Sequence, residues 1–168
     1  MMKHLYHLLP LLLLLSSVQV SHTQTQAKVF LGSSAFLDED IPFDHFLLGA
    51  SMRLYLKDRL SVEPEFLYLK GPGTDRDYLF TGNIAYDIVR WERGSLYIIG
   101  GAGVLHHTEK FPGAVEENFA VNDWTASGGV GAQIFISRSV FVTSEFRIGW
   151  EPLLRASGGI GFEFGRGQ

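Results

Sequence analysis

Two short segments of the sequence carry the residue types that catalysis or metal binding would need. His106-His107-Thr108-Glu109 combines two imidazoles with a hydroxyl and a carboxylate, and Thr143-Ser144-Glu145 places a hydroxyl beside a second carboxylate. A hydrolase needs a histidine, a hydroxyl and a carboxylate that converge, and a metal site would need several of these side chains on one side. Neighbouring side chains of a strand point to opposite faces. We therefore predict no catalytic residue, no metal ligand and no cofactor.

Charged residues inside otherwise apolar alternating segments form a second candidate site. In Val140–Trp150, for example, Glu145 and Arg147 share one face, and aliphatic and aromatic side chains dominate the other. A buried charge without a partner costs several kcal/mol. We therefore expect the charges of this face to pair with one another as a structural network. Its members are Arg53, Glu63, Glu65, Glu145, Arg147 and Glu163.

Eight segments with the alternation of β-strands must position these charges, and none has a sustained helical period. Glycine is abundant, at 19 residues, and lies inside the segments, where it would relieve crowding within a small barrel. The expected strands are Ala27–Leu37, His45–Leu56, Leu60–Lys70, Asp77–Arg90, Ser95–His106, Asn122–Ile136, Ser139–Trp150 and Leu154–Gly165.

The connections between these segments alternate between short and long. Short ones follow the second, fourth and sixth segments, and longer ones follow the first, third and fifth, the longest being the acidic loop Phe111–Asp123. Short turns at one end and longer loops at the other are typical of an up-and-down transmembrane barrel, whereas a Greek-key sandwich does not predict this order. Pro64 conflicts with the pattern because proline removes a ladder hydrogen bond, so we expect it near a rim or at a bulge.

The first 27 residues have the features of a secretory signal peptide. Lys3 provides the positive start, Leu8–Leu15 the apolar stretch, and Thr25 and Ala27 the small residues before a cleavage site. We predict cleavage after Ala27, with earlier sites at Val18 or Ser21 left open. The apolar stretch is too short to cross a bilayer as a helix, which needs roughly 20 residues. The chain therefore divides into a signal peptide, 1–27, and one barrel domain, 28–168.

The last strand resembles the C-terminal assembly signal of bacterial outer-membrane barrels. Ser157, Gly159, Phe162 and Phe164 carry the resemblance, and the chain continues for four residues beyond the final aromatic. Alternation alone does not say whether the charged face meets water or a lumen. The leader, this strand and the order of the loops favour charges inside and an apolar wall outside, which is the arrangement of a membrane barrel.

Composition narrows the classes of function. Without the leader, which holds Lys3 and no acid, 13 Lys and Arg face 18 Asp and Glu, a net charge of −5. An acidic chain without a basic cluster is a poor candidate for nucleic-acid binding. With no cysteine, an exported chain has no disulfides to stabilise it.

Three segments carry a resemblance to a known superfamily: Leu47–Leu56 (LLGASMRLYL), Leu60–Glu65 (LSVEPE) and Tyr97–Val104 (YIIGGAGV). They resemble the outer membrane protein β-barrel domain superfamily, the small eight-stranded group with OmpA-like and OmpX-like barrels. The resemblance implies an all-β, eight-stranded antiparallel up-and-down barrel in the outer membrane. It also implies outer-membrane lipid, lipopolysaccharide and the barrel assembly machinery as partners.

The expected function is that of a non-enzymatic, monomeric outer-membrane barrel with a plugged, charge-paired lumen and a structural or surface-interaction role. Two alternatives stay open. Some small outer-membrane barrels modify lipid A, and their deacylase type uses a His-x-Ser pair, which is absent after residue 27. A soluble periplasmic barrel of the lipocalin type would instead bind an apolar ligand in its interior.

Overall fold

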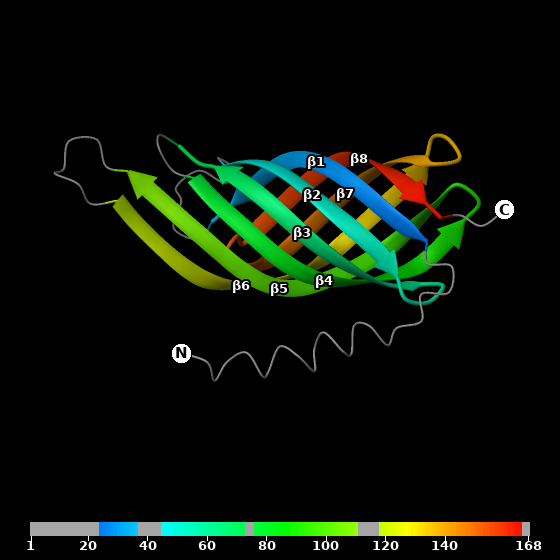
Figure 1. Cartoon of the computed structure of the whole chain (residues 1–168), viewed down its shortest axis with the longest axis horizontal. Helices are drawn as coiled ribbons and strands as arrows, with labels where there is room; N and C mark the ends of the chain where they lie inside the picture. The colour runs from blue at the N-terminus through cyan, green and yellow to red at the C-terminus, as the bar shows by residue number, and fades with distance from the viewer. Residues whose placement is uncertain (1–23, 37–44, 73–75, 111–117, 166–168) are drawn as a thin grey trace.

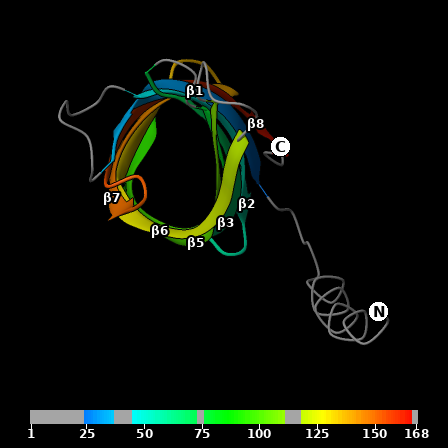
Figure 2. The ribbon, with the colours of Figure 1, turned by 90° about the vertical axis from the view of Figure 1, so that its left-hand side faces the viewer.

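The chain folds into one closed antiparallel β-barrel, in a computed structural model that describes residues 24–36, 45–72, 76–110 and 118–165. Its strands are β1 (Thr25–Ala35), β2 (His45–Tyr55), β3 (Leu60–Lys70), β4 (Arg76–Trp91), β5 (Gly94–Lys110), β6 (Asn118–Phe135), β7 (Val140–Trp150) and β8 (Leu154–Phe164). Each strand pairs with the next, and β8 pairs with β1, so the sheet closes into a ring (Figures 1 and 2). The eight-stranded barrel predicted from the sequence is confirmed. No helix among the described residues is long and apolar enough to cross a membrane.

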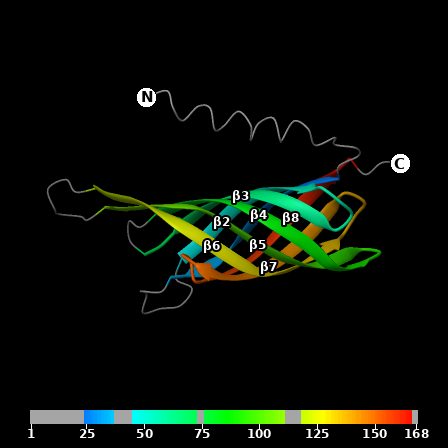
Figure 3. The same cartoon turned by 90° about the horizontal axis from the view of Figure 1, so that it is seen from below.

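The two ends of the barrel differ. The connections β2–β3, β4–β5 and β6–β7 are short and lie at the end where β1 begins and β8 finishes (Figures 1 and 3). We call this the turn end. The opposite, hairpin end is dominated by β5 and β6, which project beyond the other strands (Figure 1). Residues 37–44, 73–75 and 111–117 of the longer predicted loops lie outside the described residues.

Strands β5 and β6 are longer than the sequence pattern predicts. They stay in register from Gly94↔Ile134 to Lys110↔Asn118, so β6 begins at Asn118 rather than at the predicted Asn122, and residues 118–121 of the predicted loop belong to the strand. The alternating pattern ends early because polar residues occupy both faces of this segment, among them His106, His107 and Asn122. The two strands continue past this point because a ladder beyond the barrel needs only backbone pairing. β7 pairs with β6 only as far as Ala126↔Trp150.

Pro64 lies in the interior of β3, neither at the rim nor at a bulge, so the expectation for it was wrong. It pairs with Gly82 of β4, and the register between β2 and β3 is the same on both sides of it, with Ser51↔Glu65 and Leu54↔Val62. The ladder with β2 is interrupted at this point, and the surrounding pairs hold the register. The bulge of the described barrel occurs instead between Asp87 and Val89 of β4.

The two faces of the wall have opposite chemistry. Along β2, β3 and β7 exposed and buried residues alternate. The mid-strand charges Arg53, Glu63, Glu65, Glu145 and Arg147 are buried, whereas large apolar side chains such as Leu48, Phe66 and Phe146 are exposed. The outer face carries large exposed apolar residues on every strand, from Leu31 on β1 to Phe164 on β8. The barrel is therefore inverted relative to a water-soluble one, whose apolar face would be internal.

Inward-facing glycines make room for the bulky lumen residues. A β-carbon on Gly131 would collide with the ring of Tyr97, and one on Gly49 would collide with Phe30 and Leu67. The interior of an eight-stranded barrel is just wide enough for side chains to fill. These glycines therefore set which large side chains the lumen can hold.

The N-terminal strand bears on the predicted signal peptide. Residues 1–23 lie outside the described part of the chain, so the leader itself stays a prediction. Thr25, Gln26 and Ala27 belong to β1, where they pair with Phe164, Glu163 and Phe162 of β8. Cleavage after Ala27 would remove these three pairs from the strand that closes the barrel, whereas the earlier sites would keep them.

Candidate functional site

The candidate site is a layer of charged side chains that crosses the lumen. On one side, Glu63 of β3 is fully buried and receives three donors. Arg53 donates its Nε–H to Glu63 Oε2 at 2.6 Å, Ser51 donates its hydroxyl to Oε1 at 2.8 Å, and Lys28 Nζ lies 2.9 Å from Oε1. Strands β1, β2 and β3 thus meet at one carboxylate.

On the other side, Arg147 of β7 organises the layer. Its Nη2 lies 3.0 Å from Glu65 Oε2 and 2.7 Å from Glu145 Oε2, and its Nη1 donates to Asn83 Oδ1 at 2.9 Å. Arg155 of β8 also donates to Glu65, from Nη2 to Oε1 at 2.9 Å. This second group joins β3, β4, β7 and β8.

Lys28 and Tyr97 connect the two groups. Lys28 pairs with Glu145 as well as with Glu63. The Tyr97 hydroxyl donates to Glu145 Oε1 at 2.7 Å, and the Arg53 guanidinium carbon lies 4.0 Å from the centre of the Tyr97 ring. The charged layer consists of Lys28, Arg53, Glu63, Glu65, Tyr97, Glu145, Arg147 and Arg155. Four cations and three carboxylates therefore share a single connected cluster.

Of the six network residues predicted from the sequence, the structure brings five into this layer. Glu163, the sixth, lies near the turn end of β8, where its Oε2 accepts from the amide of Gln26 at 2.9 Å and from that of Gln24. Sequence reasoning missed Lys28, Tyr97 and Arg155. The alternation along β1, which puts Gln26, Lys28 and Phe30 on one face, could have found Lys28.

An apolar cluster fills the lumen on the hairpin side of the charged layer. Leu67 and Leu69 lie on the same face of β3 as Glu63 and Glu65. They are two and four residues beyond Glu65 towards the hairpin end. The cluster consists of Phe30, Leu47, Leu67, Leu69, Leu79 and Leu105, with Phe36 packed against it. Charges and leucines thus occupy consecutive levels of one interior.

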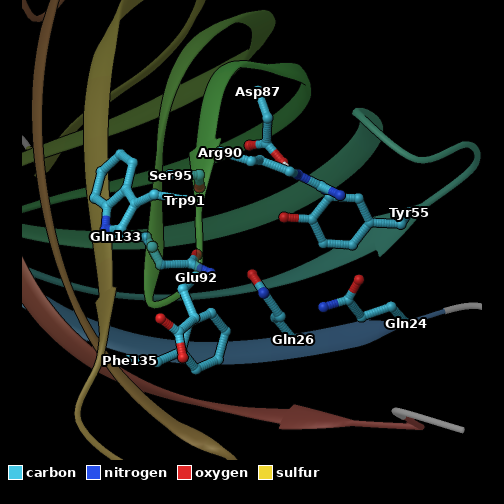
Figure 4. Close-up of a pocket in the computed structure, with 11 residues that line it drawn as sticks. Gln24, Gln26, Tyr55, Asp87, Arg90, Trp91, Glu92, Ser95, Gln133 and Phe135 are labelled. Carbon is cyan, nitrogen blue, oxygen red and sulfur yellow. Dashed lines mark hydrogen bonds and ion pairs between the residues drawn. The ribbon is translucent and has the colours of Figure 1, made fainter.

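The mouth of the lumen at the turn end contains a small polar pocket of about 120 Å³ (Figure 4). Asp87 accepts from Arg90 Nε at 2.6 Å, and the Arg90 guanidinium stacks on Tyr55 at 5.0 Å. The amides of Gln26 and Gln133 and the buried hydroxyl of Ser95 complete the wall. None of the residues of the charged layer lines this pocket.

The histidines singled out in the sequence lie apart from the charged layer. His106 Nδ1 lies 2.8 Å from Asn122 Oδ1, and His107 Nδ1 lies 2.6 Å from Asp77 Oδ1, both towards the hairpin end. Ser144 faces outward while Glu145 faces the lumen. The side chain of Glu109 lies outside the described residues. Within the described ranges no three His, Asp or Glu side chains are grouped as a metal site requires.

The residues of the predicted assembly signal all lie in β8. Phe162 and Phe164 are on the outer face and about half exposed, while Ser157 and Gly159 face inward. Their arrangement in the closed barrel does not test whether an assembly machinery recognises them, and that role stays a prediction.

Comparisons with known proteins identify relatives in fold. The N-terminal β-barrel domain of Pseudomonas aeruginosa OprF superposes with a TM-score of 0.65 at 16% identity, over 84% of this chain and 97% of that one. Neisserial surface protein A (NspA) gives 0.65 at 12%, over 86% and 98%. Ail, the attachment invasion locus protein of Yersinia pestis, gives 0.60 at 14%, over 86% and 100%. No family model and no curated protein matches the sequence. The resemblance to small eight-stranded outer-membrane barrels is thus confirmed at the level of the fold.

Proposed function

We propose that this chain is a non-enzymatic, integral β-barrel of the bacterial outer membrane with a plugged lumen, serving a structural or surface-interaction role. The observation that carries the proposal is the inversion of the wall, with apolar side chains outside and paired charges inside. The three solved barrels of similar fold support this environment, since each is an outer-membrane protein or a domain of one.

The outer wall supports insertion into lipid. Trp124, Ile136 and Phe80 are 79%, 63% and 62% exposed, and similar side chains surround the barrel. Soluble monomers rarely expose apolar patches this extensive. Strands β1, β2, β3, β7 and β8 have 11 residues each, which suits the roughly 9–11 residues that a tilted strand needs to cross a bilayer. A lipocalin-like soluble barrel would need a wettable exterior.

The interior supports a plug. Arg147 joins Glu65 of β3 to Glu145 of β7, so the layer spans the lumen from one wall to the opposite one. The apolar cluster closes the next level. We infer that the barrel does not conduct as a diffusion pore, and that its activity lies in its anchoring in the membrane and in the β5–β6 projection.

The geometry at the histidines favours a non-enzymatic role over lipid A modification. Each imidazole already has a polar partner, Asn122 or Asp77, and Ser144, the hydroxyl considered from the sequence, belongs to a different strand and faces outward. A lipid A hydrolase would need a hydroxyl and a carboxylate beside one histidine.

Expression in a Gram-negative host would test the proposal. The chain should enter the Sarkosyl-insoluble outer-membrane fraction and migrate differently on a gel before and after boiling. Purified barrel should give no steady conductance in planar bilayers, and lipid A from the host should keep its mass. A soluble periplasmic product without a heat shift would contradict membrane insertion, and a changed lipid A mass would contradict the non-enzymatic assignment.

A further inference from the structure

The turn end of the barrel carries exposed basic side chains. Lys57 and Arg59 lie in the β2–β3 turn, Arg93 in the β4–β5 turn and Arg138 in the β6–β7 turn. Neither Arg93 nor Arg138 forms an ion pair within the described part of the chain. Both guanidinium groups are therefore available to an external anion.

These two arginines border one open cleft. The backbone N–H of Phe135 donates to the Arg93 carbonyl at 2.7 Å, which fixes the β4–β5 turn beside the end of β6. Arg138 lies three residues further along, in the next turn. The resulting cleft has a volume of about 440 Å³ and is lined by Glu92, Arg93, Phe135, Ile136, Ser137 and Arg138.

The cleft opens onto the apolar wall. Ile136 lines it and is 63% exposed, and Ile134, two residues earlier on the same outer face of β6, is 49% exposed. The cleft thus combines two cationic residues of the turns with aliphatic residues of the outer wall. A phospholipid has the matching order, with a phosphate at the membrane surface and acyl chains below it.

We propose that this cleft binds the head group of an anionic phospholipid from the adjoining leaflet, with Arg93 and Arg138 on the phosphate and the acyl chains against Ile134 and Ile136. Guanidinium groups bind phosphate through charge-assisted, bidentate hydrogen bonds. Glu92 also lines the cleft, so two cations against one carboxylate leave a net charge of +1, which favours an anionic lipid over a zwitterionic one. The inference rests on the proposed membrane location.

Native mass spectrometry of the full-length barrel tests this inference. The refolded protein is mixed in detergent with equal amounts of phosphatidylglycerol and phosphatidylethanolamine of different acyl mass. Two arginines offset by Glu92 leave one basic charge at the membrane surface, so we expect roughly fivefold preferential retention of phosphatidylglycerol. The double variant Arg93→Gln/Arg138→Gln should lose most of this preference, and Glu92→Gln should increase it.

Matched variants separate this site from a general surface charge. Lys57→Gln/Arg59→Gln removes the same charge from a neighbouring turn and should keep the preference, as should Arg93→Lys/Arg138→Lys. Equal retention of the two lipids, or equal losses in the two glutamine double variants, would overturn the proposal. Every variant is first checked for the heat-dependent gel shift. A barrel that shifts but shows no lipid preference refutes only this inference, whereas absence from the outer-membrane fraction refutes the proposed function.

Discussion

The charged layer and the apolar cluster fill adjacent levels of the same lumen by different physical means. Glu63 in the layer depends on three particular donors from β1 and β2, whereas Leu67 in the cluster contributes mainly volume. Removing one member of a buried ion network leaves its partners unpaired, while removing an apolar side chain leaves a cavity. The layer should therefore specify how the strands are aligned, and the cluster should add stability without the same dependence on particular partners.

The largest expected effect comes from breaking the charged layer at Arg147. Arg147→Gln takes a cation from between Glu65 and Glu145 and should lower the free energy of unfolding by about 4 kcal/mol. Urea unfolding of the refolded barrel, followed by the fraction that keeps its heat-dependent gel shift, measures this loss. Ser144→Ala on the outer face of the same strand is the control. An unchanged urea midpoint for Arg147→Gln would show that the network does not stabilise the barrel.

Coupling within the layer gives a sharper version of the same test. The double variant Arg147→Gln/Glu145→Gln removes both charges of one pair, so its cost should be smaller than the sum of the two single costs. If the cost of the double variant equalled the sum of the two single costs, the two side chains would act independently, as residues that are far apart do.

A smaller loss is expected in the apolar cluster. Leu67→Ala removes a fully buried side chain that packs beside Leu47 and Leu69, and should cost about 3 kcal/mol through the cavity it leaves. Leu67→Met nearly conserves the volume and should cost less than half as much. If both Leu67 variants lost as much free energy of unfolding as Arg147→Gln, the charged layer and the apolar cluster would not differ in how they depend on particular side chains.

The sequence predicted the fold well because alternation reports directly on a wall that separates two environments. Leu60–Lys70 was predicted with its observed ends, and β2, β7 and β8 differ from prediction by a single residue at one end. The predicted strand ends are wrong where the outer face and the inner face no longer differ in polarity. Beyond Leu105, β5 continues into residues that are polar on both faces, and the pattern ends before the ladder does.

The site could be predicted only in part, because alternation gives the face of a residue and not its level along the barrel. Glu163 was grouped correctly by face but lies beside Gln24 and Gln26 near the turn end. Arg155 lies one residue from the hairpin end of β8 and still reaches Glu65. Which residues share a level depends on strand tilt and register, neither of which a single sequence specifies.

The boundary of the charged layer can be tested by crowding it. Gly131→Val would place a side chain where the Tyr97 ring lies, and that ring is held by hydrogen bonds to Thr143 and Glu145. We expect a loss of about 2 kcal/mol in the urea assay. Gly128→Val, three residues earlier on β6, lies on the exposed outer face, where a β-carbon would meet only the Ile99 carbonyl oxygen at 3.8 Å, and should be tolerated. Equal losses in the two variants would mean that the effect comes from the strand backbone rather than the lumen.

The smallest effect is expected at the mouth, where the same type of ion pair meets water. Arg90 pairs with Asp87 as Arg147 pairs with Glu145, but the Arg90 side chain is 34% exposed and that of Arg147 only 1%. Solvent screening reduces such pairs to about 1 kcal/mol or less, so Arg90→Gln should barely shift the urea midpoint, and added salt should abolish the difference. A loss as large as that of Arg147→Gln would show that the mouth belongs to the same rigid network as the layer. In that case burial would not explain why the two ion pairs differ in their contribution to stability, and the polar pocket at the turn end would belong to the proposed plug.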